Sequence, residues 1–251
     1  MEFVDGHDLF SWMESGMHDA SEENNSRYFR QILTAVCFLH RHFIGHRDIS
    51  LENLLICVDG GGPSTGVIKL IDFGGACRTH SESGTPLRYF RRTGKPYYQA
   101  PETDVPRPDE EHFPAWPLTE VAFPDGQRGD VVLSRVNGKR PHLCEVKLLE
   151  PGQPGQPCQA ELWGYEVPHT DVFSCGVVWF ILNYGIPPWA AVSLEDNAFK
   201  WFERNGIVDL LTRWGKNLLT PEGMELLVAM TQCRPSARPT SERCLAMLPG
   251  E

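Results

Sequence analysis

Three short stretches decide the fold, and they occur in this order along the chain: His46-Arg47-Asp48-Ile49-Ser50-Leu51-Glu52-Asn53, then Asp72-Phe73-Gly74, then Ala100-Pro101-Glu102. A lone Asp-Phe-Gly is weak evidence, because a strand that runs into a turn often produces it. Three such stretches in order, after one helix and across one hairpin, are not a chance pattern. We therefore treat them as parts of one site.

The surrounding sequence predicts the elements that carry these stretches. From Ser26 to Phe43, apolar residues recur at steps of three and four, which predicts an amphipathic helix that Gly45 ends. Two short apolar runs, 54–58 and 67–71, are separated by a glycine-rich stretch with a proline. This pattern predicts a small β-hairpin between the first two stretches.

The second half of the chain reads as helical. Residues 172–184 are almost continuously apolar and stop at Gly185, which predicts a deeply buried helix. Thr220 followed by Pro221 is typical of a helix start. Between them, 104–164 is rich in Pro, Gly and charge, and we interpret it as an insertion. Inside it, Asn137-Gly138 predicts a hairpin of 130–136 with 142–147. The fold class is mainly α (α+β).

Composition excludes some partners. The formal net charge is -10, whereas binding along a phosphate backbone needs a basic face, so nucleic acid is not expected. No apolar stretch approaches the roughly 18 residues that span a bilayer, and no membrane association is expected. The eight cysteines form no C-x-x-C pair, and we expect them to be reduced. The expected location is cytoplasmic or nuclear.

The three stretches resemble the signature set of the eukaryotic protein kinases, and the resemblance extends over about 190 residues. It implies phosphoryl transfer from ATP with Mg²⁺, in which the protein mainly positions groups and neutralises charge. Asp48 would orient the acceptor hydroxyl, and Asn53 and Asp72 would hold the metal. The implied fold is the C-terminal lobe of a kinase, helical with a small hairpin at the catalytic cleft.

Residues 1–9 resemble the kinase hinge, with Met1 at the gatekeeper position. The resemblance implies that the backbone of Glu2 and Val4 faces the adenine and that Leu55 forms the floor beneath it. Asp8 would bind the ribose, and Glu52 is counted with the nucleotide-binding residues. Nothing in 1–251 resembles the glycine-rich loop or the lysine-bearing strand of the N-terminal lobe. We therefore expect a partial kinase domain without that lobe, or a partner that covers the hinge surface.

One departure from the family pattern concerns a lysine. Kinases of the Ser/Thr type usually carry Lys two residues after the catalytic Asp, but here that residue is Ser50. The position after the glycine of the activation segment, usually a hydroxyl residue, is Lys95. The two residue types are exchanged. We expect Lys95 to reach back between Asp48 and Ser50 and to supply the missing ammonium; the alternative is a solvated loop lysine.

Other positions take regulatory or structural roles from the resemblance. Arg47, directly before Asp48, usually pairs with a phosphate on the activation segment. The candidate phosphate acceptors are Thr85 and Thr93, followed by Ser81 and Ser83. Three arginines could bind such a phosphate or an acidic substrate: Arg88, Arg91 and Arg92. Asp171 would hold the backbone of the catalytic loop. Arg238 would pair with Glu102.

Two functions remain open from the sequence. The first is a Ser/Thr protein kinase that phosphorylates protein hydroxyls, of which this chain is one part. The absence of the tyrosine-kinase pattern in the catalytic loop favours Ser/Thr acceptors. The second is a catalytically inactive binding or scaffold module that uses the substrate groove and the insertion. Such a module would expose apolar residues at the hinge edge, among them Val4, Leu55 and Phe73.

Overall fold

The computed structural model describes residues 4–16, 20–57, 66–104 and 164–248, together with the backbone of four strands between 119 and 162. The helices are α1 (Leu9–Glu14), α2 (Glu22–Arg41), α3 (Val167–Tyr184), α4 (Asn197–Arg213), α5 (Pro221–Met230) and α6 (Ser241–Met247). Short 3-10 turns are η1 (Leu51–Asn53), η3 (Phe73–Gly75), η4 (Pro101–Thr103) and η5 (Pro235–Ala237). The strands are β1 (His7–Asp8), β2 (Ile44–Gly45), β3 (Leu54–Cys57), β4 (Val67–Leu70), β5 (Cys77–Arg78), β6 (Thr119–Ala122), β7 (Val131–Ser134), β8 (His142–Leu148) and β9 (Cys158–Leu162).

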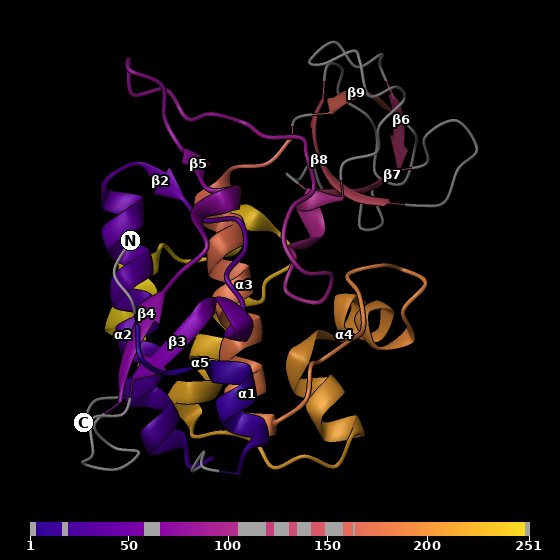
Figure 1. Cartoon of the computed structure of the whole chain (residues 1–251). Helices are drawn as coiled ribbons and strands as arrows, with labels where there is room; N and C mark the ends of the chain where they lie inside the picture. Colours follow the sequence, from indigo (N-terminus) through magenta and orange to yellow (C-terminus); the bar gives the residue numbers. More distant parts are fainter. Residues whose placement is uncertain are drawn as a thin grey trace.

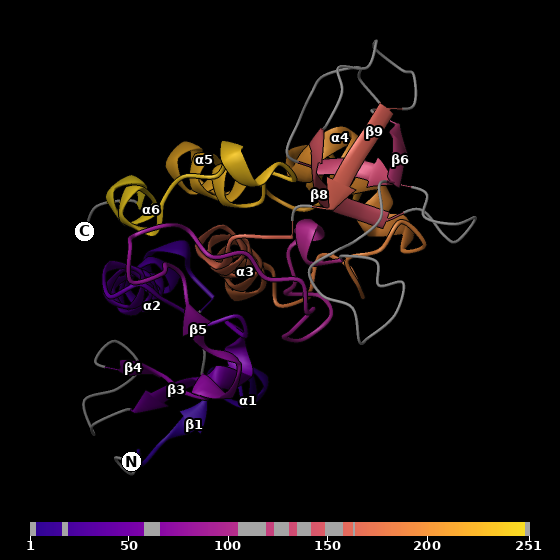
Figure 2. The ribbon, with the colours of Figure 1, turned by 90° about the horizontal axis from the view of Figure 1, so that it is seen from above.

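Helix α3 is the centre of the hydrophobic core. It lies between α2 and α4 in both views (Figures 1 and 2), and almost every residue on it is buried, as expected for a helix that is apolar all round. Trp179 packs against Phe29 of α2, with ring centres 5.0 Å apart, and its indole N–H donates to the carbonyl of Gly223. Gly185 ends the helix with a φ of 71°, a left-handed conformation that glycine adopts without strain. The predicted buried helix is confirmed.

The predicted boundaries of α2 are wrong at both ends. The helix begins at Glu22, capped by the Ser21 hydroxyl, one turn before the expected start. Its first turn is polar, so the apolar periodicity does not include it. The helix ends at Arg41, and Phe43 follows with a φ of 58°. Gly45 does not end it but lies in β2, where a Cβ atom would collide with the side chain of Val167.

The predicted hairpin is present as β3 and β4, which pair antiparallel. Strand β1 pairs with the other edge of β3, with Asp8 opposite Leu55. Residues 7 and 8, which precede α1, thus add a third strand beside the hairpin. Gly6 makes this possible, because a Cβ atom there would collide with the carbonyl of Ile56. Strands β2 and β5 form a separate two-stranded pair.

Strands β6 to β9 all fall within residues 104–164 and form a small closed barrel. The register pairs Val132 with Cys144, so β7 and β8 form the hairpin predicted around Asn137-Gly138, whose turn lies outside the described residues. Strands β6 and β9 were not predicted. Figure 1 shows the barrel at one corner of the molecule, beside η4. In the described part of the chain, no helix is both long and apolar enough to cross a bilayer.

Candidate active site

The loop of residues 46–50 is held by one buried carboxylate. Asp171, on α3, accepts hydrogen bonds from the backbone N–H of His46 at 2.7 Å and of Arg47 at 2.8 Å. Its Oδ2 atom also lies 3.1 Å from Nε2 of His40. These contacts hold Arg47 at a φ of 67°, which is strained for any residue other than glycine. The expected role of Asp171 is confirmed.

His46 and Asn53 join this loop to the residues that follow β4. The buried His46 ring bonds to the carbonyl of Ile71 through Nε2, at 3.0 Å. Because the Asp48 N–H points at Nδ1, 3.3 Å away, Nε2 is the nitrogen that carries the proton. The N–H of Ile71 donates to the carbonyl of Asn53 at 2.9 Å. Asp72 is therefore brought directly beside Asn53.

Asp48, Asn53 and Asp72 form the polar centre of the site. The amide nitrogen of Asn53 donates to the carbonyl of Asp48 at 2.8 Å and to its Oδ2 atom at 3.0 Å. The amide oxygen of Asn53 is not used in either of these hydrogen bonds. Asp72 is exposed, with a φ of 61°, and its Oδ1 atom accepts from the N–H of Gly74. An amide oxygen and a carboxylate are the hard ligands that Mg²⁺ prefers.

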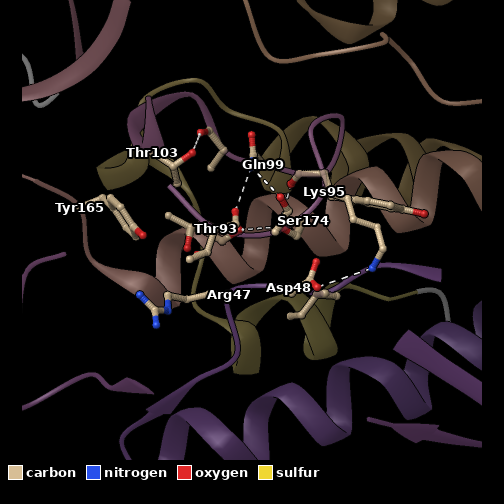
Figure 3. A pocket seen from close by; sticks show the side chains of 13 residues that line it. Arg47, Asp48, Thr93, Lys95, Gln99, Thr103, Tyr165 and Ser174 are labelled. Carbon is tan, nitrogen blue, oxygen red and sulfur yellow. Dashed lines mark hydrogen bonds and ion pairs between the residues drawn. The ribbon is translucent and has the colours of Figure 1, made fainter. Parts of the chain in front are cut away.

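Lys95 lies across the same site. Its ammonium group donates to the Ser50 hydroxyl at 2.8 Å and lies 3.6 Å from Oδ2 of Asp48. Ser50 is fully buried, whereas about a third of the Lys95 side chain is exposed. Figure 3 shows Lys95 reaching from the activation segment towards Asp48. The ammonium thus lies beside Ser50, the position at which kinases of the Ser/Thr type usually carry a lysine.

The other carboxylate oxygen of Asp48 is sheltered and unused. Oδ1 is buried and makes no hydrogen bond to the described residues. Gly94 covers it: a Cβ atom on Gly94 would lie 3.3 Å from Oδ1 and 2.7 Å from the carbonyl of Arg47. The pocket drawn in Figure 3 opens beside this atom and is bordered by Thr93, Lys95 and Gln99. The Asp48 carboxylate therefore lies at the edge of a pocket, with one oxygen facing Lys95 and the other covered by Gly94.

The residues expected to bind the nucleotide are only partly described. Glu2 and Met1 lie outside the described residues, whereas Val4 and Leu55 are partly exposed along the hairpin edge. Asp8 caps α1 and accepts from both the N–H and the hydroxyl of Ser11. Burial raises the pKa of Asp8, but these hydrogen bonds outweigh it, so the pKa is below the ordinary value. Asp8 is thus an ionised hydrogen-bond acceptor at the start of α1.

Glu52 faces the activation segment rather than the hairpin edge. Its Oε1 atom accepts from the Tyr97 hydroxyl at 3.3 Å, and its Oε2 atom is buried and makes no hydrogen bond to any described residue. The hydroxyl of the neighbouring Tyr98 accepts a hydrogen bond from the N–H of Leu51 at 3.2 Å. Tyr98 therefore supports the backbone that follows Ser50. Sequence reasoning missed both tyrosines. Their position directly after Lys95-Pro96 was the only available signal.

The arginines of the activation segment are engaged in pairs. Arg88 lies 2.7 Å from Glu166, and Arg92 lies 3.2 Å from Asp104 and also donates to Gln99. Arg91 is exposed. Among the candidate phosphate acceptors, Thr85 is exposed, while Thr93 borders the pocket. The three arginines therefore do not form one cationic surface.

The predicted pair of Glu102 and Arg238 is confirmed. The guanidinium group donates through both Nη atoms to the two carboxylate oxygens, one of them at 2.8 Å, and both side chains are completely buried. Its remaining donors bond to the carbonyls of His169, Gln232 and Cys233. The ion pair fastens the end of the activation segment to the helices beneath it.

Comparison with known proteins agrees with this arrangement. Residues 1–114 match the family described as protein kinase domain. The chain is 28% identical over 229 residues to human NUAK family SNF1-like kinase 2, covering 89% of the chain and 31% of that protein. It is 27% identical over 216 residues to the serine/threonine-protein kinase CHK1 of Saccharomyces cerevisiae, covering 86% of the chain and 29% of that protein. It is 37% identical over 102 residues to CBL-interacting protein kinase 20 of rice, covering 41% of the chain and 22% of that protein.

Residues 1–114 thus match the protein kinase domain family, and most of the chain is similar to protein kinases. The chain spans less than a third of the length of each of these relatives.

Proposed function

We propose that the chain is the hinge and C-terminal lobe of a Ser/Thr protein kinase that transfers the γ-phosphate of ATP to protein hydroxyls. The observation that carries this proposal is the meeting of Asp48, Ser50 and Lys95 beside Asn53. The yeast relative is a serine/threonine-protein kinase, which supports Ser/Thr acceptors.

Each group has a defined task in this proposal. The Asp48 carboxylate accepts the hydrogen bond of the substrate hydroxyl and orients its oxygen towards the phosphate. The Lys95 ammonium, fixed by Ser50, stabilises the negative charge that develops between the two reactants. Both groups are positioned before substrate arrives, so little reorganisation is needed during the reaction.

Asn53 and Asp72 would hold Mg²⁺, which neutralises phosphate charge when it is bound. Among the described residues, no three His, Cys, Asp or Glu side chains gather as a metal site. Two oxygen ligands are nevertheless sufficient in this chemistry, because Mg²⁺ commonly takes its other ligands from substrate phosphates and water. Val4, Asp8 and Leu55 would line the nucleotide side, with Glu2 beside them and Glu52 facing the substrate side.

The edge that carries Asp72 requires a cover. Phe73 is 49% exposed directly beside this aspartate, and Val4 and Leu55 are partly exposed along the same sheet. An N-terminal lobe, or a partner in its place, would bury this apolar edge and enclose the nucleotide. A cytoplasmic or nuclear location stays a prediction.

The test uses the full-length protein that contains this chain. Transfer of labelled γ-phosphate from Mg·ATP to Ser, Thr and Tyr peptides should occur on Ser or Thr, and Asp48→Asn should lower kcat by roughly 10²–10⁴-fold. Asp209→Asn, on exposed α4, is the matched control and should keep wild-type turnover. A folded protein that binds a partner but transfers no phosphate would instead support the alternative, an inactive binding module.

A further inference from the structure

Arg47 already has partners in the chain without any phosphate. Its Nε atom donates to the carbonyl of Gly75, and its guanidinium group lies over the ring of Tyr89, 5.0 Å from the ring centre. A guanidinium over an aromatic face at this distance is attracted by the ring. The Tyr89 hydroxyl donates to the carbonyl of Arg78 at 2.6 Å, which fixes the ring in place. Arg47 is thus held by a backbone carbonyl and by a tyrosine ring.

Tyr89 is itself held by the residues that follow the barrel. Its N–H donates to the carbonyl of Tyr165 at 2.9 Å, and the N–H of Tyr165 donates back at 2.8 Å. Gly164 lies so close that a Cβ atom there would approach the carbonyl of Tyr89 to 2.6 Å. The two reciprocal backbone hydrogen bonds, together with the close approach that Gly164 permits, make this contact tight and specific.

Side chains on both sides reinforce this contact. Tyr165 is 1% exposed, and its hydroxyl donates to the carbonyl of Arg91. Burial raises the pKa of Tyr165, a shift that contacts with Thr93 and Arg47 oppose. Figure 3 shows Tyr165 and Arg47 at the end of the pocket opposite Lys95. Next to it, Glu166 pairs with Arg88 at 2.7 Å, with about a quarter of each side chain exposed.

We propose that residues 164–166, which we name the latch, fix the activation segment and Arg47 in place of an activating phosphate. Through Tyr89, the latch positions Arg47, and Arg47 in turn positions the neighbouring Asp48. Tyr89 and Tyr165 are therefore positioning residues for phosphoryl transfer, and the kinase works without phosphorylation of Thr85 or Thr93. The inference rests on the proposed function, and it reverses the expectation that Arg47 awaits a phosphate.

The first experiment compares the full-length protein before and after phosphatase treatment, with complete removal of phosphate verified by mass spectrometry. We expect kcat on a peptide substrate to change by less than about twofold, because Arg47 keeps its aromatic partner. A loss of tenfold or more on removal of phosphate overturns the proposal.

The second experiment separates positioning from folding, using Tyr89→Leu and Tyr89→Phe in the phosphate-free protein. The leucine variant loses the ring over Arg47, so kcat should fall about tenfold while KM for ATP stays within about twofold. The phenylalanine variant keeps the ring and should stay within about threefold of wild-type kcat. Equal losses in the two variants, or a change in KM alone, contradict the role of the ring.

A third measurement is independent of catalysis and separates failure of this inference from failure of the proposed function. Amide hydrogen exchange of residues 87–92 should be slow in phosphate-free wild type and in Tyr89→Phe, and at least about tenfold faster in Tyr165→Ala. If the protein transfers no phosphate at all, this pattern still supports the latch. Fast exchange in phosphate-free wild type, slowed only by phosphorylation, overturns it.

Discussion

The ammonium group of Lys95 donates a hydrogen bond of 2.8 Å to the hydroxyl of Ser50, a buried residue on the catalytic loop. The resemblance to Ser/Thr kinases places a hydroxyl where Lys95 lies and a lysine where Ser50 lies. The two residue types are thus exchanged relative to that pattern, and Lys95 and Ser50 contact each other directly. The charge therefore enters the site from the activation segment rather than from the loop.

Removing this charge should slow phosphate transfer. We expect Lys95→Ala to lower kcat by about 10- to 100-fold, less than for a fully buried donor, because a third of the side chain is exposed. Lys200→Ala, exposed on α4, is the control and should leave kcat unchanged. Steady-state peptide phosphorylation measures both.

The double variant Ser50→Lys/Lys95→Thr should recover most of the loss. Wild-type turnover of Lys95→Ala, together with an inactive Ser50→Ala, would show that Lys95 is only a solvated loop residue.

Breaking the buried pair of Glu102 and Arg238 should destabilise the fold. We expect Arg238→Ala to lower the free energy of unfolding by about 3–5 kcal/mol, because it leaves a buried carboxylate without its partner. Arg27→Ala removes an exposed pair on α2 and should have little effect. Urea denaturation measures both. The pair would have no structural role if the two variants unfolded at the same urea concentration.

Gly164→Ala should lower the free energy of unfolding more than Gly215→Ala, although both glycines have a positive φ. Both Gly164, at φ 72°, and Gly215, at φ 63°, pay the conformational penalty of about 1 kcal/mol when they become alanine. Only at Gly164 does the new Cβ atom meet a backbone oxygen, whereas nothing lies within 4 Å at Gly215. Gly164→Ala should therefore cost at least about 1 kcal/mol more in urea denaturation. Equal costs would show that the latch backbone moves aside freely.

His169 should make the fold sensitive to mild acid. Burial lowers its pKa below the ordinary value of 6.5, and the charge of Arg238 adds to this effect, while Glu166 and Glu102 oppose it. The unfolded chain then binds a proton more readily than the folded one, so stability is lost as pH falls through about 6.5. Between pH 7.5 and 5.5, His169→Gln should lose less stability than wild type in urea denaturation. A larger loss in the variant would mean that His169 is stabilised as the cation.

Local patterns in the sequence were enough to predict the elements that depend on local interactions. The apolar run ending at Gly185 identified α3, and the two short apolar runs identified β3 and β4. The first turn of α2 was missed because Glu22 and Asn25 break the apolar periodicity, although Ser21 is an ordinary cap. Strand β9 could not be foreseen, since it closes the barrel by pairing with β6, from which β7 and β8 separate it along the chain.

The same distinction applies to the site. Asp48, Asn53 and Asp72 stand out because their motifs are short and ordered, and Lys95 stands out because it replaces a hydroxyl residue. Their roles in transfer stay predictions, to be tested by the variants above. Tyr165 gave no signal, because its contact with Tyr89 joins residues 76 positions apart. Glu102 and Arg238 are farther apart still, but the family pattern names both.

The residues just before and just after the barrel segment are both attached to the activation segment. Asp104, before it, pairs with Arg92, and Glu166, after it, pairs with Arg88, so both ends attach to the same five residues of the activation segment. Any displacement of the barrel would therefore act first on residues 88–92, through these two ion pairs, and only through them on the neighbouring Lys95.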